Sequence, residues 1–182
     1  MGHLNDSDRA YLRELRDKKI LLDIDSHLLD QKDGVIMIAC ADGDQMPDVF
    51  EKQEEYLLEQ RETPRIHTLA LNGGAIVVPA DSPLNSELPK GRVIIDDIKG
   101  AMMLKGIRTI VLYAHAPCGA AGLYHLNTEE VINFLIRAKE EIKTAVADIK
   151  VACFFHVDWG DHKRTYFVSA AKWRKERYLI DS

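Results

Sequence analysis

The stretch VIMIACADGD, residues 35–44, decides the fold. It begins with a continuous apolar run after the turn residues Asp33-Gly34, and it passes at Cys40 into a polar loop. A short apolar run with turn signals on both sides is typical of a strand that is buried on both faces, as in a parallel sheet. The stretch therefore predicts a parallel strand that carries a cysteine at its carboxyl end, with Asp42 directly beyond it.

Further segments of the chain extend this pattern. Helix-like segments separate the apolar runs, and such alternation predicts an α/β fold with a mostly parallel central sheet flanked by helices. A strand near the C-terminus, after the turn Trp159-Gly160-Asp161, is expected to run antiparallel at the edge of the sheet. The expected strands are 35–40, 66–71, 75–78, 109–114, 151–157 and 165–169, and the main expected helices are 47–60, 93–105 and 127–145.

The N-terminal part is expected to be helical. Ser7 can cap a first helix, and a second apolar-periodic stretch follows through Leu21, Leu22, Ile24, Leu28 and Leu29. The chain of 182 residues has the length of one domain. We therefore expect a single α/β domain over residues 1–182, in which a helical arm (1–32) precedes the core (33–182).

Charge and cysteine content limit the functional classes. The chain has 24 basic and 29 acidic residues, which gives a net charge of −5. This balance argues against a protein that binds nucleic acid or anionic membrane surfaces, because such binding needs a basic surface. No apolar run approaches the length that spans a membrane. Three cysteines are an odd number, so metal binding or thiol chemistry is a better expectation than a disulfide framework. We expect a cytoplasmic protein.

Two short motifs bring together residues that bind metals. Cys40-Ala41-Asp42 and His115-Ala116-Pro117-Cys118 each follow a predicted strand, and parallel strands present their carboxyl ends at the same edge of a sheet. Two thiolates and one imidazole suit zinc, and three protein ligands with an open fourth position are typical of catalytic zinc. Spacing alone leaves two alternatives open: small buried cysteines beside a strand-end histidine, or a thiol enzyme that uses Cys118 at a helix start.

The same residues carry a resemblance to a known family. Cys-x-Asp followed by His-x-x-Cys-Gly, each at the end of a buried strand, resembles the β-class carbonic anhydrases. The similarity also includes the glycine turn Asn72-Gly73-Gly74 and the segment 96–108, and it covers roughly residues 34–125. It implies a Rossmann-like three-layer fold, a zinc ion, carbon dioxide and bicarbonate as small-molecule substrates, and a homodimer or higher homo-oligomer.

The resemblance also implies roles for individual residues. Cys40, His115 and Cys118 would bind Zn²⁺, and Asp42 would be the family's switch carboxylate, which either pairs with an Arg two residues later or closes the metal site. Here the sequence departs from the family pattern, because Asp44 occupies the position of that Arg. Leu71 likewise replaces the Arg that commonly precedes the glycine turn.

These departures define the functional alternatives. The first is a lyase of the carbonate-dehydratase type, in which zinc-bound hydroxide attacks carbon dioxide and Asp42 and Asp44 act at the site. An unpaired Asp42 is drawn toward the metal, and Asp44 adds negative potential that disfavours an anionic product. The second alternative is therefore a closed, inactive zinc protein with a binding or regulatory role. The third is hydrolysis of another small heteroallene.

One weaker signal lies near the C-terminus. His156-Val157-Asp158, with His162 beyond the turn, could form a proton relay or a second metal site, but the pattern favours the polar face of an edge strand. Cys153 in the same segment is expected to pack in the core.

Overall fold

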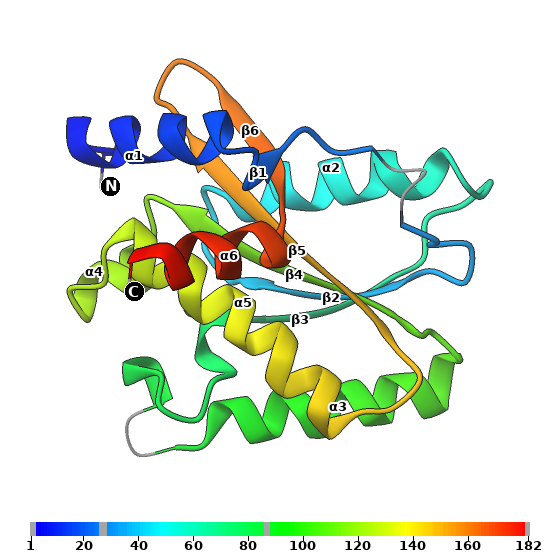
Figure 1. Ribbon diagram of the computed structural model, residues 1–182. Coiled ribbons are helices and arrows are strands. Elements are labelled where there is room, and N and C mark those ends of the chain that lie inside the picture. Colours follow the sequence, from blue (N-terminus) through cyan, green and yellow to red (C-terminus); the bar gives the residue numbers. More distant parts are fainter. Residues whose placement is uncertain (1–2, 26–28, 86–87, 181–182) are drawn as a thin grey trace.

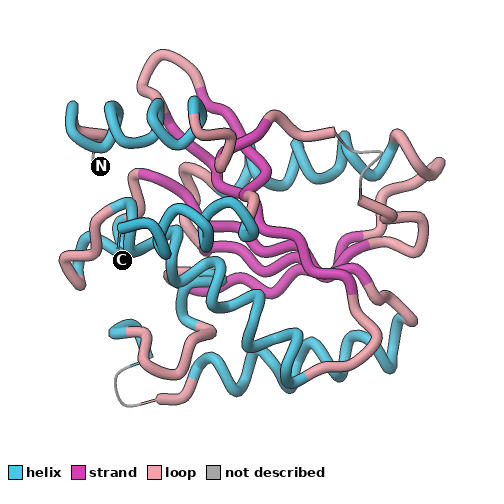
Figure 2. The backbone as a smooth tube through the Cα atoms, viewed as in Figure 1, coloured by secondary structure: helices cyan, strands magenta, loops and turns pink. Residues whose placement is uncertain are grey.

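A computed structural model describes residues 3–25, 29–85 and 88–180 (Figure 1). Helices lie on both sides of one central sheet, as the tube in Figure 2 shows. The strands are β1 (Leu21–Leu22), β2 (Val35–Cys40), β3 (Ile66–Leu71), β4 (Thr109–Ala116), β5 (Lys150–Asp158) and β6 (Lys163–Val168). The α-helices are α1 (Asp6–Asp17), α2 (Met46–Leu58), α3 (Lys90–Lys105), α4 (Gly119–Leu123), α5 (Thr128–Ala145) and α6 (Ala170–Ile180), and the 3₁₀ helices are η2 (Gly74–Val77) and η3 (Pro83–Asn85).

The sheet has the strand order β1-β6-β5-β4-β2-β3. The four strands β3, β2, β4 and β5 pair in parallel, whereas β6 pairs antiparallel with β5 and β1 antiparallel with β6. The predicted fold class, an α/β protein with a mostly parallel sheet and an antiparallel strand near the C-terminus, is confirmed. The two-residue strand β1 pairs along the outer side of β6 and forms that end of the sheet.

Alternating side chains of the central strands supply two hydrophobic cores. Ile36 and Ile38 face the core that α3 and α5 cover, whereas Val35 and Met37 face the core that α2 covers. Because both faces of β2 are buried, its sequence is an uninterrupted run of apolar residues rather than an alternation of apolar and polar residues. This is the physical reason why the segment could be recognised as a central strand.

The N-terminal region differs from the expected pair of helices. Asn5, not Ser7, caps α1, because its side chain accepts the backbone N–H of Asp8. The segment expected as a second helix contains β1, which pairs with β6 (Leu21 opposite Val168). Lys19 has a φ of 56° and lies where the chain passes from α1 to β1, on the side of β6 away from β5. Of the residues in the expected second helix, Leu28 lies outside those that the structure describes.

The prediction of an extended segment at 75–78 is wrong. Residues 75–77 belong to η2 and Val78 is its C-cap, and all four are buried. Gly73 and Gly74 both have positive φ (91° and 55°) and turn the chain back over β2, so that the apolar run packs against β4 and α5 instead of joining the sheet. The helix ends, by contrast, follow the sequence signals: Gly106 ends α3 in the left-handed conformation, and Asn127 with Glu130 forms a capping box at α5.

Gly74 is required where the chain crosses the end of β2. A Cβ atom at this position would lie 2.4 Å from the backbone nitrogen of Cys40 and 2.5 Å from the carbonyl carbon of Ala39. We expect Gly74→Ala to lower the free energy of unfolding by about 2–4 kcal/mol, because it combines a backbone clash with a left-handed φ. Urea denaturation followed by circular dichroism measures this change.

Gly100→Ala is the matched control. Gly100 lies inside α3, and a Cβ atom there meets nothing within 4 Å. Alanine in a helix interior is expected to raise the free energy of unfolding by about 0.5–1 kcal/mol. Equal effects of the two substitutions would contradict the close approach of η2 to β2.

Candidate metal centre

Three metal-binding side chains meet at the carboxyl ends of β2 and β4. Cys40 is the last residue of β2, His115 lies one residue before the end of β4, and Cys118 directly precedes α4. The two sulfur atoms and a ring nitrogen of His115 all lie within 4.8 Å of one another, so the group could hold a metal ion. Cys40 and His115 are buried, and Cys118 is partly exposed. We refer to these three residues as the Cys-His-Cys group.

The histidine of the group is oriented by the backbone. His115 Nδ1 lies 2.8 Å from the carbonyl oxygen of Pro117, which can only accept, so Nδ1 carries the proton and donates. Nε2 is then the unprotonated nitrogen. It is buried and has no hydrogen-bond partner among the described residues. A buried acceptor without a partner costs free energy, and a metal ion is one means of satisfying it.

The two cysteines share an electrostatic environment. The backbone N–H of Gly73 donates to Cys40 Sγ at 3.3 Å. The contact with Cys118 is the largest influence that lowers the pKa of the Cys40 thiol, and nearby His115 lowers it further. The same contact raises the pKa of Cys118. Without a metal, the pair therefore favours one thiolate and one thiol.

Asp42 lies beside the group. Its Oδ2 is 4.0 Å from His115 Nε2, and its Oδ1 accepts the backbone N–H of Asp44 at 3.0 Å. The side chain is 27% exposed. The carboxylate of Asp42 is thus within a short movement of any ion that Nε2 would bind.

Two cavities flank the group. An apolar cavity of about 240 Å³ lies on the side of Cys118, and its walls include Leu4, Ala116, Leu126 and Val131. A polar cavity of about 410 Å³ lies on the side of Asp42. The polar residues of its wall are His3, Arg9, Asp42, Asp44, Gln45 and Asp158. Asp42 and Asp44 were predicted as site residues and Asp158 was considered only with His156, whereas no local pattern in the sequence links His3, Arg9 or Gln45 to this place.

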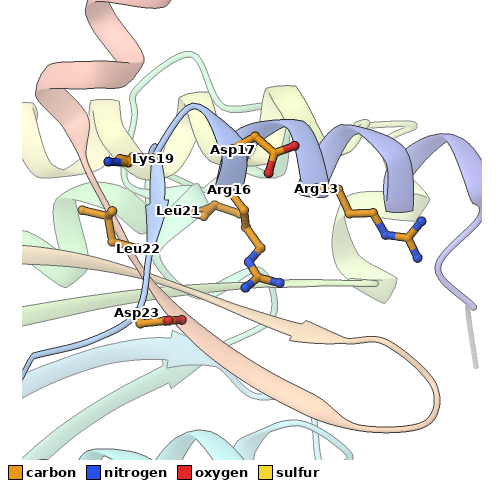
Figure 3. Close-up of a pocket in the computed structure, with 7 residues that line it drawn as sticks. All are labelled: Arg13, Arg16, Asp17, Lys19, Leu21, Leu22 and Asp23. Carbon is orange, nitrogen blue, oxygen red and sulfur yellow. The ribbon is translucent and has the colours of Figure 1, made fainter.

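A third cavity, of about 640 Å³, lies between α1 and β1 (Figure 3). Figure 3 shows Arg13 and Arg16 projecting from α1, with Leu22 and Asp23 of the following segment opposite them. None of the predicted site residues lines this cavity. Although this cavity is larger than the two cavities beside the Cys-His-Cys group, we therefore do not assign it as the functional site.

The favoured interpretation of His156 is wrong, because β5 lies between β4 and β6 and is not an edge strand. His156 is 2% exposed, and its Nδ1 lies 2.9 Å from the Thr165 hydroxyl. His162 is exposed and bonds Asp161 instead. Within the described part of the chain, the only group with metal-binding geometry is the Cys-His-Cys group. Cys153 is buried in the core, as expected.

The fold and the site together define an α/β protein with a two-thiol, one-imidazole group at the carboxyl ends of parallel strands. No family model and no curated protein matches the chain. Several solved structures resemble it. They include the β-carbonic anhydrase CafA of Aspergillus fumigatus (12% identity, covering 93% of this chain and 92% of that chain, TM-score 0.46) and a carbonic anhydrase from Streptococcus mutans (14% identity, 93% and 99% covered, TM-score 0.46).

A third similar structure is β-carbonic anhydrase isoform I from Trichomonas vaginalis (12% identity, 92% of this chain and 99% of that chain covered, TM-score 0.42). No helix in the described residues is long and apolar enough to cross a membrane.

The buried His156 provides a pH-dependence prediction. Burial lowers the pKa of His156 from 6.5 to about 4. A histidine with a depressed pKa in the folded state contributes stability that is present above pH 6.5 and is lost as the pH falls toward 4. We expect metal-free wild-type protein to lose on the order of 2–3 kcal/mol more unfolding free energy over this window than His156→Gln, as measured by urea denaturation.

His162→Gln is the control for this measurement, because His162 is exposed at the neighbouring turn. Its stability should follow that of the wild type over the same pH range. A His156→Gln variant with an unchanged pH dependence would show that His156 does not carry this linkage.

Proposed function

We propose that the chain binds Zn²⁺ through Cys40, His115 and Cys118. The observation that carries this proposal is the convergence of a His115 ring nitrogen and two cysteine sulfurs within 4.8 Å of one another, together with a buried His115 Nε2 that has no hydrogen-bond partner among the described residues. The donor set fits the metal, because thiolate and imidazole are preferred zinc ligands. The surrounding backbone fits as well: Pro117 fixes the tautomer that leaves Nε2 free, and Gly73 donates to the Cys40 sulfur.

The reaction that we propose is the reversible hydration of carbon dioxide to bicarbonate, as the sequence resemblance implies. Zinc, when bound, supplies a water molecule with a lowered pKa. The apolar cavity beside Cys118 offers a small uncharged substrate a position next to the group. Asp42, held by the N–H of Asp44, directs Oδ2 toward the group and can accept a hydrogen bond or a proton there. The carboxylate of Asp44 adds negative potential.

A closed site is the second candidate, and the position of Asp42 favours it. With Oδ2 at 4.0 Å from His115 Nε2, Asp42 is near enough to become a fourth ligand after a small side-chain movement. A chain in this state would have a binding or regulatory role. Hydrolysis of another small heteroallene would use the same residues and the same apolar cavity.

We also propose that the chain forms a homodimer or a higher homo-oligomer and that it is located in the cytoplasm. Both come from the resemblance and from the composition. The three cysteines are free, which fits a reducing compartment.

Removal of one proposed ligand tests the metal site. We expect purified wild-type protein to carry one zinc per chain, and Cys118→Ser to lose most of it, because serine is a poor ligand for zinc. Inductively coupled plasma mass spectrometry after dialysis against a weak chelator measures the content. Cys153→Ala is the matched control, because Cys153 is a buried free cysteine outside the group. Stoichiometric zinc in Cys118→Ser would remove that residue from the ligand set.

Stopped-flow measurement of carbon dioxide hydration tests the reaction. With zinc-loaded protein between pH 7 and 9, we expect a zinc-dependent rate that rises with pH, because Asp42 and Asp44 oppose the loss of a proton from water at the site. Asp44→Asn should shift the profile to lower pH by on the order of half a unit. Asp96→Asn, at an exposed position of α3, should leave it unchanged.

A rate no higher than that of buffer at every pH, with one zinc per chain, would contradict the proposed hydration. X-ray absorption at the zinc edge would then distinguish a closed zinc site from one that keeps an exchangeable water. Two sulfurs, one nitrogen and a carboxylate oxygen would identify Asp42 as the fourth ligand, whereas an exchangeable water would point to a different substrate.

A further inference from the structure

Leu4 lies at the Cys-His-Cys group although it is far from the ligand residues in the sequence. It directly precedes Asn5, the N-cap of α1. Its side chain is 6% exposed, whereas the neighbouring residues His3 and Asn5 are exposed. A leucine that is buried between two exposed residues directs its side chain into the molecule. Leu4 belongs to the hydrophobic core that α3 and α5 cover.

Leu4 lies where the apolar and the polar cavity adjoin. Among the described residues, three line both cavities: Leu4, Pro117 and Gly119. Pro117 and Gly119 adjoin Cys118 in the chain, so Leu4 is the shared residue that comes from another part of the fold. The partly exposed Cys118 lines the apolar cavity and not the polar one. The side chain of Leu4 is therefore in a position to separate the space beside Cys118 from the polar cavity.

Hydrogen bonds hold the backbone of Leu4 in this position. Arg9 Nε donates to the carbonyl oxygen of Leu4 at 3.2 Å. The side chain of Asn5 accepts the backbone N–H of Asp8 at 2.8 Å, and the hydroxyl of Thr128 donates to Asp8 Oδ1 at 2.6 Å. Because Thr128 is the first residue of α5, these bonds connect the first turn of α1 to that of α5. The place of Leu4 is thus fixed by the backbone as well as by packing.

Few side chains determine the size of the apolar cavity. Its volume is about 240 Å³, and its large apolar residues are Leu4, Leu126 and Val131. The residues next to Cys118 and those of α4 are small, namely Ala116, Gly119, Ala121 and Gly122. A change in the size of this cavity therefore depends on the three branched side chains. Of these, Leu4 alone also lines the polar cavity.

We propose that Leu4 is a specificity-determining residue, which limits access to the Cys118 side of the Cys-His-Cys group to small uncharged molecules. Its side chain restricts the size of the apolar cavity and separates it from the carboxylates of the polar one, Asp42, Asp44 and Asp158. In naming a small uncharged substrate, the inference rests on the proposed function. The assignment of Leu4 itself rests on the geometry of the two cavities.

Alkylation of Cys118 in the metal-free full chain tests this role. Iodoacetamide and N-phenyl-iodoacetamide both react by displacement of iodide by the thiol sulfur, and they differ by a phenyl ring. The ratio of their rates therefore reports the space in front of the thiol and not its intrinsic reactivity. Peptide mass spectrometry separates modification of Cys118 from that of Cys40 and Cys153. We expect Leu4→Ala to raise the rate of the bulky reagent relative to the small one roughly tenfold, and Leu4→Phe to lower it.

Leu15→Ala is the matched control. Leu15 is a leucine of α1 that is 2% exposed and lines neither cavity. Its substitution removes the same atoms and weakens the packing of α1, but it should leave the ratio of rates unchanged. Leu4→Val, a smaller truncation, should give an intermediate ratio and keeps the series informative where Leu4→Ala does not fold.

An unchanged ratio in the Leu4 variants, or an equal rise in Leu15→Ala, would overturn the assignment of Leu4. The measurement needs no zinc and no catalytic turnover. Absence of carbon dioxide hydration would therefore contradict the proposed function alone, whereas a ratio that does not depend on Leu4 would contradict this inference alone.

Discussion

The parallel pairing of β2 with β4 is the constraint on which the rest of the site depends. Ile36 lies opposite Ile110 and Ile38 opposite Leu112, and this register brings the carboxyl ends of both strands to the same edge. Cys40 and His115 are the residues at those ends, so their proximity is fixed by backbone hydrogen bonds rather than by a flexible loop. A one-residue slip would turn every buried side chain of the strand to the other face, and the two buried cores therefore hold the register.

The backbone around the group decides the chemical state of its ligands. His115 Nδ1 donates to the carbonyl of Pro117 only because the chain turns back directly after β4. Gly73 reaches the sulfur of Cys40 because two glycines with positive φ carry η2 across the end of β2. These contacts leave one ring nitrogen and one sulfur ready for an electrophile before any metal arrives, and preorganisation of this kind lowers the cost of ordering the site.

The sequence predicted those features that local patterns encode. The buried strands, the helix ends at Gly106 and Asn127, and the convergence of two motifs at one sheet edge follow from apolar runs, capping residues and α/β topology. The run 75–78 was misassigned because apolar residues suit a strand and a buried 3₁₀ turn equally well. Part of the polar cavity was missed for a different reason: Arg9 and Gln45 are ordinary surface types, Asp158 was considered only together with His156, and only the tertiary fold brings these residues to Asp42 and Asp44.

Electrostatics connects the two cavities. Two thiolates and a neutral imidazole would cancel the charge of Zn²⁺, so the Cys-His-Cys group with its metal contributes little net charge. The carboxylates around the polar cavity then dominate the local potential, and they oppose an anionic product as well as the loss of a proton from water. The apolar cavity shares Leu4, Pro117 and Gly119 with the polar cavity, so it lies within reach of this potential. An uncharged substrate in the apolar cavity would not be repelled by it, whereas an anionic one would.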